Sequence, residues 1–101
     1  MPEFDFDRER TLLIISEAFG GDGEFISSTA ESIVHFFPLA GVRGAVSIEM
    51  LGESGGVHFR IESEDGRHYL INWAGGNLLI EDQETNELLL MHDSQGGLIH
   101  P

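Results

Sequence analysis

The hydrophobic residues of this chain follow a helical spacing in its N-terminal part and an alternating spacing in the remainder. The first helical pattern covers 8–19, where three apolar residues fall at i, i+3 and i+7: Leu12, Ile15 and Phe19. Asp7 is a suitable N-cap, and Gly20-Gly21 is typical of a helix end. The pattern therefore predicts a helix, while the β-branched residues of 11–16 leave a buried strand as the alternative.

A second helical pattern covers 26–37 and forms one apolar stripe: Ile26, Ala30, Ile33, Val34 and Phe37. Ser28 and Glu31 have the spacing of a capping box, so a later start at Thr29 is the alternative. Pro38 ends this helix, because its ring removes the N–H donor and clashes with the preceding turn. We expect the helix to pack on the apolar face of the sheet that follows.

The rest of the chain alternates between apolar and polar residues, as strands do when one face packs on a core and the other faces water. The apolar positions are Val46, Ile48 and Met50, then Val57, Phe59 and Ile61, then Tyr69, Ile71 and Trp73, then Leu78 and Ile80. The final run, 88–91, is apolar throughout. It therefore indicates a strand that is central in the sheet or covered by another subunit.

Two turns set the register of the middle strands. Glu64-Asp65-Gly66 suits a three-residue hairpin loop with its glycine in the left-handed conformation, and Gly75-Gly76 suits a two-residue turn. The first turn pairs three apolar couples on one face: Ile61 with Tyr69, Phe59 with Ile71, and Val57 with Trp73. On the other face, Arg60 and Arg67 are predicted to form ion pairs with carboxylates of the same hairpin.

The predicted fold is α+β, a single domain over 1–101 with two N-terminal helices followed by an antiparallel β-meander of about five strands, one helix packed on the sheet. In outline, helix 26–37 followed by a long meander resembles the cystatin-like architecture, an analogy of fold that implies no function and no site residue. Edge strands at 45–51 or 88–91 also make a homodimer a prediction.

The charge of the chain is the feature that bears most on its function. Among 101 residues, 18 are Asp or Glu, five are Arg and none is Lys, which gives a formal net charge of −13. Such a surface repels nucleic acid and anionic membranes and attracts basic proteins. Hydrophobic residues make up 41% of the chain, too many for a disordered acidic tail.

The sequence also bears on the compartment. The chain has no Cys, which removes disulfides, thiolate metal sites and Cys nucleophiles and fits a reducing environment. Residues 1–7 are acidic and have no apolar core of the kind found in a signal peptide. The longest apolar runs, 12–15 and 88–91, are far shorter than the roughly 20 residues that span a bilayer. We expect a cytoplasmic protein.

No pattern indicates a catalytic residue, a cofactor or a metal site. The sequence has no Gly-x-Ser-x-Gly elbow, P-loop or dinucleotide fingerprint. The histidines form no HxH or HxxxH pair, and the predicted register places His58 opposite Asn72 and His68 opposite Glu62. The loop 20–24 holds two carboxylates without the spaced ligands of an EF-hand, so a helix-to-helix turn explains it better. We therefore predict a binding protein and not an enzyme.

The predicted function is that of a small acidic module that inhibits or neutralises a basic partner, such as a nuclease, a toxin or a nucleic-acid-binding effector, as immunity or anti-defence proteins do. The predicted contacts are carboxylates near the hairpin ends: Glu62, Glu64, Asp65, Glu81, Asp82 and Glu84. Two alternatives stay open. One is a small protein of a halophilic cytosol, whose charge answers to solvent, and the other is a small-molecule-binding α+β domain.

One apolar feature falls outside the predicted core. Leu70 and Leu79 lie on the outer face of the predicted sheet, among charged and histidine side chains. If that face is open, it is an apolar patch surrounded by charge, as a partner surface would be. The alternative is that helix 8–19 or Leu98-Ile99 covers it.

Overall fold

The computed structural model describes residues 6–20, 24–52, 56–93, 95 and 97–99, with 24–27, 98 and 99 described through their backbone alone. The turn expected at 20–24 therefore lies for the most part outside the described residues. Among the helices of the described part, none combines the length and the apolar character needed to cross a membrane.

The first helix, α1, runs from Arg8 to Ala18 and confirms the helical prediction against the strand alternative. Asp7 caps it, since its side chain accepts a hydrogen bond from the backbone N–H of Arg10 at 3.0 Å. Thr11 and Ile15 are fully buried. The β-branched residues that suggested a strand therefore include two that face the core from a helix.

The second helical segment is divided at Phe36. Helix α2 runs from Glu24 to His35, which is earlier than the alternative start at Thr29, and a short helix α3 covers Phe37–Ala40. Pro38 ends the longer helix as predicted, but it also occupies the first turn of α3, where a missing N–H costs nothing. Phe37 is fully buried and belongs to α3, so the predicted helix end at 37 is about two residues too late.

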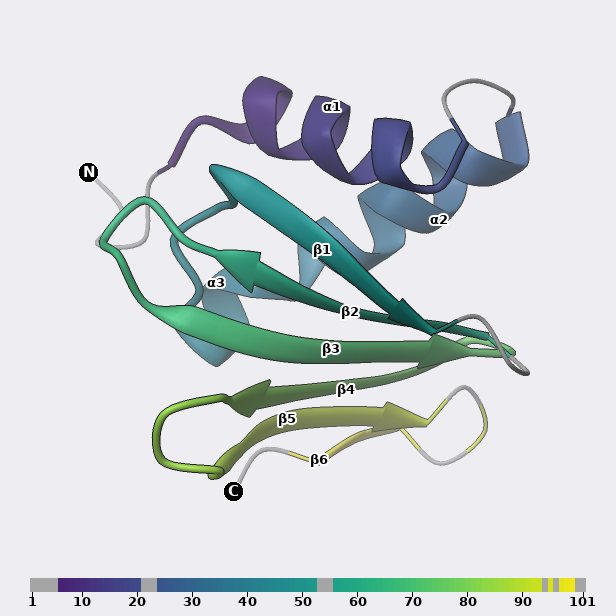
Figure 1. The fold of residues 1–101 in the computed structure, drawn as a ribbon. Coiled ribbons are helices and arrows are strands. Elements are labelled where there is room, and N and C mark those ends of the chain that lie inside the picture. Colours follow the sequence, from purple (N-terminus) through teal and green to yellow (C-terminus); the bar gives the residue numbers. More distant parts are fainter. Residues whose placement is uncertain (1–5, 21–23, 53–55, 94, 96, 100–101) are drawn as a thin grey trace.

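Six strands follow: β1 (Ser47–Gly52), β2 (Val57–Glu62), β3 (His68–Ala74), β4 (Asn77–Asp82), β5 (Leu88–Asp93) and β6 (Gly97–Ile99). They form one antiparallel sheet in which each strand pairs with its neighbour in the chain (Figure 1). The predicted meander of about five strands is confirmed, and β6 is a short addition to it. Because β6 pairs with β5, the apolar run in β5 lies inside the sheet.

The predicted register of the middle strands is confirmed. Cross-strand neighbours on β2 and β3 are Ile61 and Tyr69, Phe59 and Ile71, and Val57 and Trp73. Gly66, at φ 83°, closes the hairpin between these strands, while Gly75 and Gly76, at φ 58° and 88°, form the next turn. These left-handed conformations are the ones that glycine adopts without strain. The pairing of β4 with β5 shifts by one residue between Ile80 and Glu81, as in a β-bulge.

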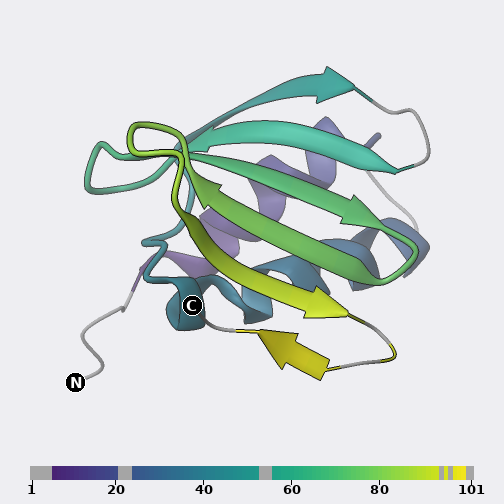
Figure 2. The ribbon, with the colours of Figure 1, turned by 90° about the horizontal axis from the view of Figure 1, so that it is seen from below.

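The helices cover one face of the sheet, called here the inner face, and leave the opposite, outer face without a helix (Figure 2). Buried residues of α1, α2 and α3 meet buried residues of the strands in one core: Ile15, Ala30, Ile33, Val34, Phe37, Phe59, Ile61, Tyr69, Ile71, Leu78, Ile80 and Leu90. The rings of Phe19 and Phe59 also meet edge to face, 5.5 Å apart. The expected packing of the second helix on the sheet is confirmed.

Candidate functional site

The outer face of the sheet is the candidate functional site. Cross-strand partners share a face of a sheet, so the register arranges its side chains in three rows. The rows are Ser47, Glu62 and His68, then Glu49, Arg60, Leu70, Glu81 and Leu88, then His58, Asn72, Leu79 and Met91. The face is therefore charged near β1 and β2 and increasingly apolar toward β5.

Four apolar side chains form a stripe across β3, β4 and β5, called here the apolar stripe: Leu70, Leu79, Leu88 and Met91. All four are half-buried although no helix lies over them. The alternative that helix 8–19 covers this face is wrong, because α1 packs on the inner face through Ile15. Residues 97–99 do not lie across the face either, since they extend the sheet as β6.

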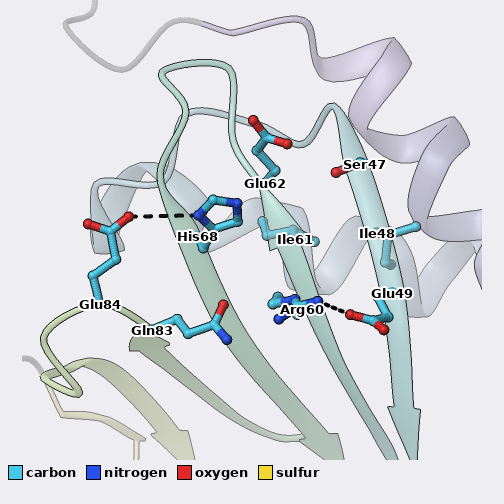
Figure 3. A pocket seen from close by; sticks show the side chains of 9 residues that line it. All are labelled: Ser47, Ile48, Glu49, Arg60, Ile61, Glu62, His68, Gln83 and Glu84. Carbon is cyan, nitrogen blue, oxygen red and sulfur yellow. Dashed lines mark hydrogen bonds and ion pairs between the residues drawn. The ribbon is translucent and has the colours of Figure 1, made fainter.

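A shallow hollow of about 500 Å³ lies at the β1 side of this face (Figure 3). It is lined by strand residues and by the turn after β4: Ser47, Ile48, Glu49, Arg60, Ile61, Glu62, His68, Gln83 and Glu84. Its two basic side chains already have acidic partners. Arg60 forms an ion pair with Glu49, and His68 Nδ1 lies 3.7 Å from Glu84 Oε1.

Glu62 stands between these two pairs. Figure 3 shows its side chain between Ser47 and His68, which are its cross-strand neighbours. No described residue donates a hydrogen bond to its carboxylate or forms an ion pair with it. The Glu62 carboxylate therefore supplies negative charge in the hollow, and a cationic group could form an ion pair with it without breaking a contact of the fold.

The structure separates the six predicted contact carboxylates into two groups. Three of them, Glu62, Glu81 and Glu84, lie on or beside the outer face, and Glu62 and Glu84 share the hollow. The remaining three have partners within the fold. Asp65 belongs to the second group, since it accepts a hydrogen bond from the Ser63 hydroxyl inside its own turn.

Glu64 connects a hairpin to a helix. Its Oε2 accepts hydrogen bonds from the backbone N–H of Asp7 at 2.8 Å and from Arg10 Nη2 at 3.0 Å. Two donors at the N-terminal end of α1 thus hold this carboxylate, where the helix dipole also favours negative charge. Its charge is already used by the fold.

Asp82 ends β4 beside a turn and is nevertheless buried, only 7% exposed. Its Oδ1 accepts hydrogen bonds from the backbone N–H groups of Glu84 and Thr85, at 2.8 and 3.3 Å, and shapes the turn between β4 and β5. Its Oδ2 lies 3.6 Å from Arg67 Nη1. Asp82 therefore holds Glu84 at the rim of the hollow.

The two arginines of the β2–β3 hairpin do pair locally, but with other strands. Arg60 reaches back to Glu49 of β1, and Arg67 reaches forward to Asp82 at the end of β4. The prediction of pairs within one hairpin is wrong, because the nearest carboxylates come from the neighbouring strands. Sequence reasoning missed Glu49 as part of the site, although the alternation of β1 places it on the polar face.

The three described histidines of the sheet divide between its two faces. His58 and His68 lie on the outer face, opposite Asn72 and Glu62 as the register predicted. His92 lies on the inner face, where its ring stacks on Phe36 with 4.7 Å between centroids. No group of three His, Asp or Glu residues within the described ranges could hold a metal ion.

The fold changes the acidity of Tyr69. Burial, reinforced by the nearby Asp65 carboxylate, raises the pKa of its phenol above the ordinary 10.0. This group is 2% exposed and faces the core, so it does not contribute to the outer face.

Comparison of the chain with protein-family models, with curated proteins and with solved structures finds no match.

Proposed function

We propose that this chain is a small acidic binding domain that inhibits or neutralises a basic protein partner, such as a nuclease, a toxin or a nucleic-acid-binding effector. The partner binds to the outer face of the sheet, and the chain occupies the positive surface with which the partner would hold nucleic acid. The absence of Cys suits a reducing compartment, and we place the encounter in the cytoplasm. The proposed action is binding and not catalysis.

One observation carries this proposal: the outer face has no helix over it and combines the apolar stripe with carboxylates that have no partner in the described part of the fold. A sheet face meant only for water would not need four large apolar side chains across three adjacent strands. Interfaces of this kind place an apolar centre beside a polar rim.

The two parts of the surface have different roles. Burial of the apolar stripe supplies the binding free energy, at roughly 25 cal/mol per Å² of apolar surface removed from water. The charge of −13 attracts a basic protein over distance and accelerates association. Glu62, Glu81 and Glu84 then select the orientation of the partner, because they are the predicted contact residues that lie on or beside the outer face.

A charge-reversal experiment tests the proposal. A panel of purified nucleases with basic clefts is assayed for cleavage of nucleic acid at about 0.15 M NaCl, with and without this protein. The variant E62K/E81K/E84K reverses the charge of the three predicted contact carboxylates on or beside the outer face. We expect the unchanged protein to inhibit at least one nuclease and the variant to lose that inhibition by about 100-fold or more.

A matched control separates the surface from the overall charge. The variant E9K/E17K/E31K changes the net charge equally, but its substitutions lie on exposed positions of α1 and α2. We expect it to keep most of the inhibition. Equal losses in the two variants would show that the acidity acts without a defined surface, and no inhibition across the panel would count against the proposed class of partner.

A further inference from the structure

Strand β1 is the least buried of the strands β1 to β5. It contains no buried residue, and four of its six positions are exposed. Val46, just before it, and Leu51, near its end, are among the large hydrophobic residues that solvent reaches, at 39% and 45% exposure. By contrast, strand β2 next to it contains two buried residues.

The outer edge of β1 is open to pairing. Within the described residues, β1 pairs only with β2, so the backbone groups along its other edge meet no strand. Proteins protect such edges with short strands, Pro, Lys or bulges. β6, at the opposite edge, is protected by having three residues, whereas β1 has six and contains neither Pro nor Lys. Its protection is limited to Glu49 and a bulge between Met50 and Gly52.

We propose that β1 receives an extended basic segment of the partner as an additional strand of the sheet. This inference relies on the proposed function for the positive charge of the partner, and it adds how and where that partner binds. Backbone hydrogen bonds along β1 would supply affinity, and side chains at alternate positions would supply specificity.

The side chains of β1 specify the pattern of the added strand. On the inner face, Ile48 and Met50 pack against the core and would contact apolar side chains. On the outer face, Ser47 and Glu49 open directly into the hollow that holds Glu62. Because opposite residues of two strands share a face, a segment that alternates basic and apolar residues satisfies both sides.

A second copy of this chain is a poorer occupant of the same edge. Each copy carries a net charge of −13, so two copies repel one another as their β1 edges approach. Like charges opposite one another in a sheet oppose pairing. A basic segment has the complementary charge, so it is attracted to this edge and not repelled by it.

Three synthetic peptides test this inference. The parent peptide alternates Arg and Val over about eight residues, enough to pair along β1. The second carries N-methyl groups on each Arg, and the third carries them on each Val. Neighbouring residues of a strand point their N–H groups to opposite edges, so one of these two peptides presents no N–H to β1 while its charge is unchanged.

We expect the parent to bind at about 0.15 M NaCl and to slow hydrogen exchange at the backbone amides of residues 46–52. One methylated peptide should bind at least about tenfold more weakly than the other. Equal affinity of all three peptides, with changes confined to the outer face, would overturn strand pairing and leave the proposed function intact. Failure of the parent to bind would also overturn the inference, whereas the nuclease assay decides the proposed function separately.

The oligomeric state distinguishes a second copy of the chain from a basic segment at this edge. Sedimentation of the protein at high concentration should give a monomer, in which the β1 amides that point away from β2 exchange freely. A dimer whose β1 amides are protected from exchange would show that a second copy, and not a basic segment, occupies this edge.

Discussion

The buried Thr11 hydroxyl of α1 accepts a hydrogen bond from the backbone N–H of Ala45, 3.0 Å away, in the segment that leads into β1. Both residues are fully buried. The approach is close, since a Cβ on the neighbouring Gly44, at φ 70°, would lie 2.7 Å from Thr11 Oγ1. This contact fixes the first helix to the start of the sheet.

Replacing the hydroxyl should destabilise the fold. The substitution Thr11→Val keeps the shape of the side chain but leaves the buried N–H of Ala45 without its acceptor, which costs about 1–3 kcal/mol. Thr11→Ser keeps the acceptor and should lose less of the free energy of unfolding. Urea unfolding monitored by circular dichroism measures both, and equal stability of the two variants would contradict this account.

Two carboxylates two residues apart should respond in opposite ways. Glu64→Gln weakens the hydrogen bonds from Asp7 and Arg10, and we expect a loss of about 0.5–1 kcal/mol, because the pair is partly exposed. Glu62→Gln removes a charge with no described donor, so its free energy of unfolding should not fall. Binding of the basic partner should weaken in Glu62→Gln and change less in Glu64→Gln.

The stability of the fold should decrease in alkaline solution because of Tyr69. Burial raises the pKa of this phenol above 10.0, so the folded state holds the proton more tightly than the unfolded chain does. Its contribution is complete below about pH 10 and is lost as the pH rises through the raised pKa. Urea unfolding at about pH 8 and pH 11 measures the loss, which Tyr69→Phe should remove.

The same prediction has a direct spectroscopic check. Tyr69 is the single Tyr of the chain, so the phenolate absorbance belongs to it alone. A midpoint at or below pH 10 in the folded protein would contradict the burial argument. A midpoint above it, lowered by urea, agrees with it.

Salt should stabilise a fold that already forms without it. The buried core joins all three helices to the sheet, so we expect cooperative unfolding at low ionic strength. Added NaCl screens the repulsion within a chain of net charge −13 and should raise the Tm by roughly 5 °C for each kcal/mol of repulsion removed. Folding that requires molar NaCl would instead favour the alternative of a halophilic cytosol.

The register of the middle strands could be predicted because local turn chemistry and hydrophobic pattern agree there. Gly66 and the pair Gly75-Gly76 each require a specific turn, and a shift by one residue would turn Phe59 out of the core. β6 could not be predicted, because three residues are too few for alternation to be recognised. The short helix α3 does not follow from the sequence pattern, because a proline after a helical stripe indicates a helix end as readily as the first turn of a new helix.

The candidate site was harder to predict than the fold. The polar face and its Leu70 and Leu79 followed from alternation, but the partner of each charge depends on which strands are adjacent. No turn signal fixed the pairing of β1 with β2, so the contact of Arg60 with Glu49 was not foreseen. The burial of Asp82 does not follow from its place beside a turn, because it depends on the hydrogen bonds that its carboxylate accepts there from backbone N–H groups.

The meander order has a consequence for how the chain folds. Each strand pairs with the next one, so the hairpins close over short loops, whereas the bond between Thr11 and Ala45 spans 34 residues and that between Asp7 and Glu64 spans 57. Short loops cost less entropy to close, and we expect the sheet to form before α1 docks. During that interval the inner face is bare and prone to aggregate. Mutual repulsion between molecules of charge −13 would then keep them apart until α1 docks on the sheet.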